Sequence, residues 1–299
     1  MTTATIPAPR LGIAYLSAGA ALLIWGATPT ATKFVVGEFD PLMAAVLRTV
    51  VAAAFVLPFV IWFRMPLPTG RQDGLLLLVT SFTGFVGFTL LFSYGVQQTS
   101  AVHAAMINAG IPVFSGLFGA ISERRIPGKL WLLGGGIACI GEVYLIFERG
   151  DGSGQATLFG DLLCVLSSAC VAVGYVTGAR LSRKYKAIHV TFWSLILAGV
   201  VQLPLLIWAL QKGMLMDKSV FAWQGVLFLA ILTTIVGYVC WYKALAEGGV
   251  VRMSVTQFIM PVVSVSMVVL ILGEPFTLPV MISMLVIVSG IAITRLDKQ

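Results

Sequence analysis

The sequence predicts an all-α integral membrane protein: ten transmembrane helices in two inverted five-helix repeats, with both termini cytoplasmic. Three observations lead to this fold class. The 299 residues are 59% hydrophobic and only 10% charged, with a mean hydropathy of +0.99, whereas soluble domains carry about 25% charged residues. Uncharged apolar segments of about 20 residues, the length that crosses a bilayer, recur along the chain. The two halves of the chain also resemble each other.

This composition excludes several classes of protein. A soluble enzyme, a nucleic-acid-binding protein or a disordered protein needs a polar surface that this chain does not supply. The chain has a net charge of +7. In a membrane protein, such an excess of basic residues usually lies in the cytoplasmic loops. The four cysteines and two histidines are scattered through the chain and form no cluster with metal-ligand spacing. We therefore expect no metal and no cofactor.

Apolar segments predict the membrane spans in order along the chain. The first segment is followed by similar ones and is longer than the apolar core of a signal peptide, so it is an uncleaved span. Residues 74–122 carry no charge but exceed one span, and we divide them at the polar run 97–100. The Gly- and Ser-rich segment 148–159 predicts a linker at the middle of the chain. The ten ranges are 11–32, 41–63, 74–95, 99–121, 130–147, 160–179, 190–210, 221–243, 250–271 and 277–294.

Basic residues predict the orientation of these spans. With the N-terminus inside, 14 basic residues fall in inside segments and 4 in outside segments, while Arg48 lies within a span. This bias predicts that both termini are cytoplasmic. The inside residues are Arg10, Arg64, Arg71, Arg124, Arg125, Lys129, Arg180, Arg183, Lys184, Lys186, Lys243, Arg252, Arg295 and Lys298, and the outside residues are Lys33, Arg149, Lys212 and Lys218.

The internal repeat is clearest around two prolines. Residues 100–115 align with residues 249–264 at an offset of 149. The aligned pairs are His103 with Arg252, Asn108 with Gln257 and Pro112 with Pro261. The repeat predicts two domains, 1–149 and 150–299. Because each domain has an odd number of spans, the second copy inserts into the membrane upside down. Inverted repeats place a binding site near the bilayer midplane between the copies, as in secondary transporters.

Several motifs resemble those of the EamA-type drug/metabolite transporter family. Residues 25–33 (WGATPTATK) resemble its first-span WG…K signature, and residues 41–48 (PLMAAVLR) resemble its second-span P…R pattern. Residues 94–123 and 242–274 resemble its Y…P…E motif, although the first copy is shorter between Pro and Glu. The resemblance covers nearly the whole chain and implies a transporter whose two halves line a central cavity. Within the family, the chain is similar to the YddG-type exporters of aromatic and other amino acids.

Polar and aromatic side chains within the spans are the candidate substrate-binding residues. Asn108 and Gln257 each precede a proline by four residues. A proline in a membrane helix frees a backbone carbonyl about one turn earlier. The amide at this position has three alternative roles: it binds the substrate, it hydrogen-bonds the freed carbonyl, or it joins two helices. Aromatic rings inside a cavity would stack on a substrate or attract its ammonium group. The alternative is that these rings belong to the belt of aromatic residues at the membrane–water interface. The binding candidates are Trp25, Tyr94, His103, Asn108, Tyr175, Tyr238, Trp241 and Gln257. The candidates for hinges, gates or helix caps are Pro112, Pro261, Lys33 and Arg180.

Arg48 and Glu142 are the charged residues deepest within the predicted spans. A charge within the membrane is costly and usually faces a partner or water. The alternatives for Arg48 are such a functional position, a structural pair, for which Glu142 is a candidate, and extension to the outer surface. Glu142 is expected to be the only carboxylate within a span, and therefore the candidate buried proton carrier. With so few charges inside the spans, we do not expect the substrate to be held mainly by charge.

The predicted function is secondary transport that exports amino acids, aromatic and other neutral ones, or similar small metabolites across a bacterial inner membrane by alternating access. The alternative is export of cationic drugs or of another metabolite class, such as nucleotide sugars or purines, on the same fold. The chain has no Walker A motif and no metalloprotease or serine hydrolase motif, so we expect no ATP-driven transport and no enzyme. The expected partners are a small-molecule substrate and the lipid bilayer, without nucleic acid, and a monomer is compatible with the sequence.

Overall fold

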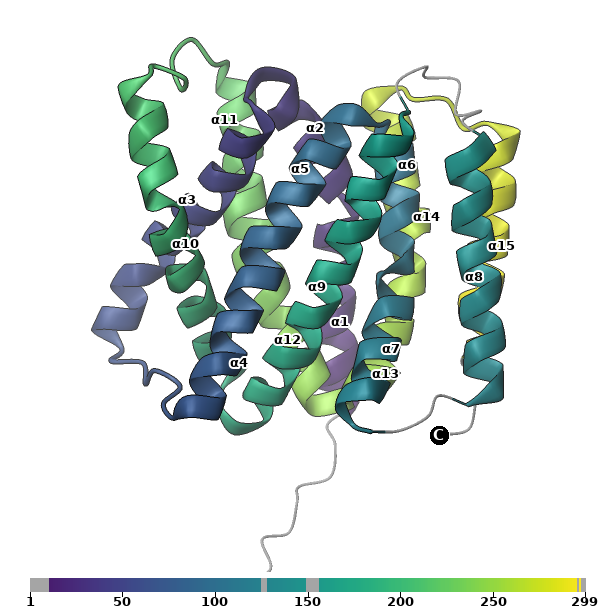
Figure 1. Cartoon of the computed structure of the whole chain (residues 1–299), viewed down its shortest axis with the longest axis horizontal. Coiled ribbons are helices and arrows are strands. Elements are labelled where there is room, and N and C mark those ends of the chain that lie inside the picture. The colour runs from purple at the N-terminus through teal and green to yellow at the C-terminus, as the bar shows by residue number, and fades with distance from the viewer. Residues whose placement is uncertain (1–10, 125–127, 149–155, 295, 297–299) are drawn as a thin grey trace, which may run out of the picture.

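The computed structural model describes residues 11–124, 128–148, 156–294 and 296, which form helices and turns without a strand (Figure 1). The helices of the first half are α1 (Leu11–Gly26), α2 (Thr28–Glu38), α3 (Pro41–Trp62), α4 (Arg71–Ser81), η1 (Phe82–Gly87), α5 (Phe88–Gln98), α6 (Ala101–Ile107), η2 (Asn108–Gly110), α7 (Ile111–Ser122) and α8 (Lys129–Glu148). The helices of the second half are α9 (Leu158–Lys184), α10 (Ala187–Gln211), α11 (Val220–Leu227), η3 (Phe228–Val236), α12 (Gly237–Gly248), α13 (Val250–Ser254), η4 (Val255–Ile259), α14 (Met260–Met267), η5 (Val268–Leu272) and α15 (Leu278–Thr294).

The all-α membrane class is confirmed. In the described residues, eight helical segments are long and apolar enough to cross a membrane, and the segments Met260–Leu272 and Leu278–Thr294 are apolar but shorter. The first segment continues to Glu38, beyond its predicted end, because apolar residues follow Lys33. The number of crossings and the orientation of the termini stay predictions. The predicted domains 1–149 and 150–299 also stay a prediction, and their boundary lies outside the described residues.

Both halves interrupt their α-helices at corresponding places. The π-helical segments η1 and η3 lie between α4 and α5 and between α11 and α12. The 3₁₀ segments η2 and η4 lie just before Pro112 of α7 and Pro261 of α14. Proline lacks the amide hydrogen that continues the α-helical pattern, so the preceding turn adopts the tighter form. Such interruptions change how backbone carbonyls point, and they often mark functional sites.

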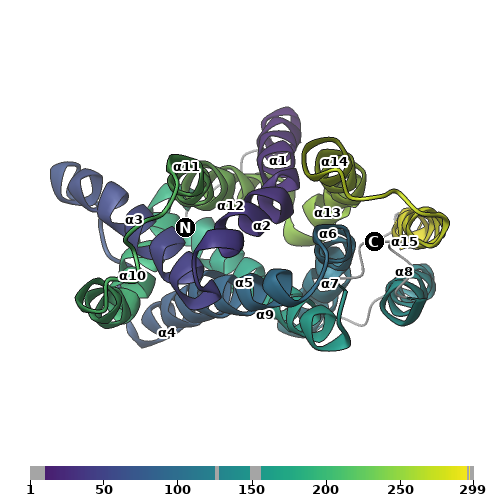
Figure 2. The same ribbon diagram turned by 90° about the horizontal axis from the view of Figure 1, so that it is seen from above.

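The two halves are interleaved rather than placed side by side. Helix α1 packs on α12, α3 on α10, α5 on α9 and α8 on α15, and each of these pairs takes one helix from each half. Figures 1 and 2 show the pair α8 and α15 at one end of the long axis and the pair α3 and α10 at the other. Glycine permits the closest approach, because a Cβ atom on Gly290 would lie 2.5 Å from the backbone nitrogen of Ala138. Small residues serve this purpose at membrane helix interfaces.

The bundle has two ends, which we name from Figure 1. The upper end holds the start of α6 and α9 and the end of α5, and the lower end holds the start of α4 and the end of α9. The described basic residues of the lower end are Arg64, Arg71, Arg124, Lys129, Arg180, Arg183, Lys184, Lys186, Lys243 and Arg252, and those of the upper end are Lys33, Lys212 and Lys218. The basic residues outside the described part of the chain are Arg10, Arg125, Arg149, Arg295 and Lys298. Most of the described basic residues lie at the lower end, so the lower end is the one that the sequence predicts to face the cytoplasm.

Candidate functional site

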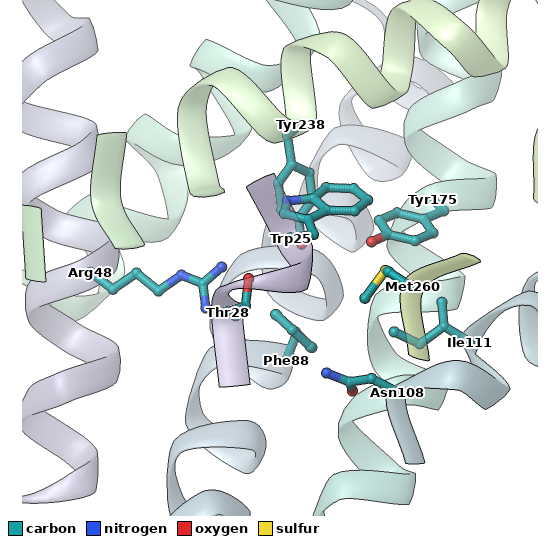
Figure 3. Close-up of a pocket in the computed structure, with 9 residues that line it drawn as sticks. All are labelled: Trp25, Thr28, Arg48, Phe88, Asn108, Ile111, Tyr175, Tyr238 and Met260. Atoms are coloured by element: carbon teal, nitrogen blue, oxygen red, sulfur yellow. The ribbon is translucent and has the colours of Figure 1, made fainter. Parts of the chain in front are cut away.

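A small cavity lined by buried residues lies between the central helices, where side chains from both halves meet (Figure 3). Its volume is about 20 Å³, which holds about one water molecule. All of its lining residues are buried, so a molecule larger than water fits there only if the lining side chains move apart. The lining residues are Trp25, Thr28, Arg48, Phe88, Asn108, Ile111, Tyr175, Tyr238 and Met260.

Four aromatic rings form a cluster at one side of this cavity. The Trp25 and Tyr175 rings stack nearly parallel, 5.6 Å apart between centroids and 7° between planes. Tyr238 meets Trp25 edge-on at 5.3 Å, and Trp241 lies 5.7 Å from both Trp25 and Tyr175. Offset stacked and edge-on contacts are the favourable geometries for aromatic pairs. The aromatic cluster, defined as Trp25, Tyr175, Tyr238 and Trp241, is therefore a rigid apolar wall.

The π-helical segments hold the aromatic cluster in place. The indole nitrogen of Trp25 donates to the Thr233 carbonyl in η3 at 2.8 Å, and the Tyr238 hydroxyl donates to the Gly84 carbonyl in η1 at 2.8 Å. In a π-helical turn, a carbonyl leaves its usual partner and becomes available to a side chain. Each half thus supplies one irregular segment that orients a ring at the cavity.

The two predicted amides lie close to the cavity. Asn108 lines it from η2, and its side-chain oxygen accepts a hydrogen bond from the Ser168 hydroxyl at 3.3 Å. Gln257 in η4 is also buried. It lies beside Tyr175, whose ring borders the cavity. The prolines that follow the two amides, Pro112 and Pro261, are also buried.

Arg48 also lines the cavity, which distinguishes between the alternatives for its position. Its side chain is 3% exposed, and Nε donates to the Thr234 hydroxyl at 2.7 Å. The guanidinium carbon lies 5.5 Å from the centre of the Phe88 ring, and Figure 3 shows the group pointing into the cavity. Among the described residues it forms no ion pair with Glu142, and it does not reach the outer surface. The rotation of α3 aims it inward instead.

The upper end contains a second buried carboxylate that the sequence interpretation missed. Asp161, in the first turn of α9, is fully buried. Its carboxylate contacts His103 Nδ1 at 3.0 Å and accepts a hydrogen bond from the Thr99 hydroxyl at 2.6 Å. Glu142 is therefore not the only carboxylate within a predicted span. The signal was present, because Asp161 is the only acidic residue in the range 160–179.

Of the twelve predicted site residues, Trp25, Asn108, Tyr175 and Tyr238 line the cavity. Trp241 and Gln257 lie beside the lining residue Tyr175, and Pro112 and Pro261 directly follow the lining residues Ile111 and Met260. The other four lie away from the lining. His103 is fully buried at the upper end, and its Nε2 atom has no hydrogen-bond partner among the described residues. Lys33 donates to the carbonyls of Val96 and Thr99 at 3.1 and 2.6 Å, which caps the end of α5. Tyr94 and Arg180 are exposed. The structure therefore brings together the aromatic cluster and the two amides, without these four residues.

Four further lining residues could not be identified from the sequence. They are Thr28, Phe88, Ile111 and Met260. Each is an ordinary residue of an apolar span, so composition and spacing do not distinguish it from its neighbours. Its place at the cavity depends on which face of the helix packs inward.

Comparisons with known proteins agree with this architecture. The profile of the EamA-like transporter family matches residues 12–147 and again residues 158–296. The chain is 27% identical over 242 residues to the uncharacterized transporter YdeK of Bacillus subtilis, covering 80% of this chain and 82% of that one. It is 25% identical over 290 residues to the uncharacterized transporter YetK of the same organism, covering 96% and 88%.

Two further matches extend the comparison. The chain is 25% identical over 230 residues to the uncharacterized inner membrane transporter YicL of Salmonella typhimurium, covering 77% of this chain and 75% of that one. A solved crystal structure with 20% sequence identity superposes with a TM-score of 0.66, covering 95% of this chain and 99% of that one. At this identity, the structural likeness shows a shared fold alone.

Proposed function

This chain belongs to the EamA-like transporter family, and we propose that it exports amino acids, aromatic and other neutral ones, or similar small metabolites by alternating access. It is a multi-pass membrane transporter, and the proposal places it in a bacterial inner membrane. The observation that carries the proposal is the aromatic-walled cavity, which takes Trp25 from the first half and Tyr175 and Tyr238 from the second. Such walls accept an aromatic or alkyl side chain by stacking and apolar contact.

Interleaved halves support the proposed alternating access. At the upper end, His103 of the first half contacts Asp161 of the second half. At the lower end, Asp73 of the first half pairs with Lys184 of the second half. Each end is thus held closed by contacts between the halves. Breaking the contacts of one end while keeping those of the other opens the cavity to one side only, as in inverted-repeat transporters.

The competing proposal is export of cationic drugs. A cavity for an organic cation usually carries a carboxylate partner for it. The described lining contains the cation Arg48 and no acidic side chain, and Glu142 and Asp161 are not part of it. The composition of the lining therefore favours the amino-acid proposal over the cationic one.

Counterflow in proteoliposomes tests the proposal. The purified protein is reconstituted with internal unlabelled L-phenylalanine, and uptake of labelled L-phenylalanine is measured against competition by neutral amino acids and by tetraphenylphosphonium. We expect exchange that neutral amino acids inhibit and the cation does not. Tyr175→Ala is expected to abolish the exchange, whereas Tyr94→Ala, a matched change on an exposed tyrosine, is expected to leave it unchanged. Exchange of the cation without any amino acid would refute the proposal.

A further inference from the structure

Arg48 is the one charged side chain among the described residues of the cavity lining, and the structure shows one hydrogen bond from its guanidinium group to another described residue. The guanidinium group has several N–H donors arranged as a planar fork. In the structure, Nε donates to the Thr234 hydroxyl. The remaining donors point toward the cavity beside Thr28 (Figure 3). The nearest aromatic face is that of Phe88, which is polarizable but accepts no strong hydrogen bond.

Among the described residues, no carboxylate forms an ion pair with Arg48. In the described parts of the chain, the ion pairs are His103 with Asp161, Arg183 with Glu123, and Lys184 with Asp73. Asp161 is therefore already engaged by another residue. Glu142 is buried on α8, and its carboxylate lies against Gly110 rather than beside Arg48.

A charge inside the membrane is costly unless it meets a partner or water. Since the cavity holds about one water molecule, water alone solvates the guanidinium poorly. The Thr234 hydroxyl and the Phe88 ring stabilise the charge only in part, because neither carries a full opposite charge. This geometry therefore leaves a site that an anionic group from outside the protein would complete.

We propose that Arg48 binds the carboxylate of the transported molecule, so that the substrate class is carboxylates with an apolar or aromatic body, and amines that lack a carboxylate are excluded. This inference rests on the proposed function and specifies its substrate. In Figure 3, Arg48 lies on one side of the cavity, and Tyr175, Met260 and Ile111 lie on the other. A carboxylate held by the guanidinium fork in two parallel hydrogen bonds directs the rest of the molecule toward these apolar side chains. Charge thus contributes to holding the substrate, beside the apolar and aromatic contacts.

A panel of four related compounds tests this assignment by competition in the L-phenylalanine counterflow assay. L-phenylalanine and 3-phenylpropanoate carry the carboxylate, whereas L-phenylalaninamide and 2-phenylethylamine lack it. We expect the two carboxylates to compete and the other two compounds to compete at least ~10-fold more weakly, because one charge-assisted hydrogen bond contributes about a factor of 10 or more. Equal competition by an acid and its amide in the unaltered protein overturns the assignment without any variant.

Variants locate the discrimination at Arg48. Arg48→Gln is expected to weaken competition by both carboxylates by roughly 10- to 100-fold and to leave the amide unchanged. Arg48→Lys keeps the charge but loses the fork, and we expect an intermediate loss. Arg64→Gln, an exposed arginine at the lower end, serves as the control and should have no effect. If Arg48→Gln retains the preference for the acid over the amide, the assignment is wrong.

The failure of this inference is distinguishable from that of the proposed function. Exchange of L-phenylalanine with no acid preference refutes only the role of Arg48. Exchange of none of the four compounds by the unaltered protein refutes both. Thr234→Val provides a second route if Arg48→Gln does not fold, because it removes the hydroxyl that positions Nε. It is expected to weaken carboxylate competition and not amide competition, and equal weakening of both contradicts the inference.

Discussion

The buried pair of His103 and Asp161 allows a sharp test of how the upper end is held closed. Both side chains are fully buried, and they join α6 of the first half to α9 of the second half. Asp161 also accepts the Thr99 hydroxyl at 2.6 Å. Its position in the first turn of α9 adds a favourable interaction with the positive end of the helix dipole. We therefore expect the two residues to stabilise the closed structure together rather than independently.

The magnitude follows from which groups each substitution leaves without a partner. His103→Leu leaves a buried carboxylate with only Thr99, and removing one partner of a buried pair costs about 3–5 kcal/mol. Asp161→Val leaves the imidazole and the Thr99 hydroxyl without their acceptor, and each costs about 1–3 kcal/mol. In the double variant, only the Thr99 hydroxyl has lost its hydrogen-bond partner. The double change therefore costs less free energy of unfolding than the sum of the single changes. We expect a coupling of about 2 kcal/mol, within the range for contacting residues.

The assay is a double-mutant cycle on unfolding in detergent, with counterflow measured on the same four proteins. The matched control is the pair Asp73 and Lys184, which also joins the two halves but is exposed on the lysine side. Solvent screens that pair, so its coupling should be much smaller. A coupling for His103 and Asp161 that is indistinguishable from zero, or smaller than that of the control pair, would refute this reasoning.

Three further variants follow from the contacts of single residues. Trp25→Phe removes the hydrogen bond to the carbonyl in η3, and we expect a loss of about 1 kcal/mol in unfolding free energy together with slower counterflow. Glu274→Gln weakens the carboxylate cap on the first two amides of α6, and we expect a loss of about 1 kcal/mol, measured by thermal unfolding. Gly174→Ala places a Cβ atom 2.8 Å from the Gly84 Cα atom. It should cost about 1–3 kcal/mol, whereas Gly74→Ala, which meets nothing within 4 Å, should be neutral or stabilising.

The spans follow from the sequence because hydrocarbon accepts only long apolar helices. The interruptions of the helices can be predicted from the sequence only in part. Pro112 and Pro261 predict the two 3₁₀ segments that precede them, whereas the π-helical segments η1 and η3 contain no proline. The aromatic and amide candidates were identified because polar groups inside a span are unusual. Their selection was too broad, because Tyr94 has the same chemistry as Tyr175 and differs only in its helix face.

The positions of Arg48 and Asp161 could not be predicted from the residues next to them in the sequence. Arg48 points into the cavity because Thr234, which is 186 residues away in the chain, holds its Nε atom. Asp161 lies at a helix start, where an acidic residue is ordinary in sequence. Its burial results from the packing of α9 against other helices, including α5 and α6. The interleaving of the halves is likewise a property of helix contacts between them. Rotation and long-range pairing, rather than composition, therefore decide which charges face the cavity.

The two ends of the bundle are closed by contacts of different strength, and this difference bears on the direction of transport. The upper end is held by His103 and Asp161, from which water is excluded. The lower end is held by pairs such as Arg183 with Glu123, whose side chains are 53% and 34% exposed. Exposed pairs exchange readily with water and stabilise little, whereas breaking a buried pair is costly. We therefore expect the lower end to open more easily. If the lower end faces the cytoplasm, as the basic residues predict, this difference favours opening of the cavity toward the cytoplasm, which is the side from which the proposed export would start.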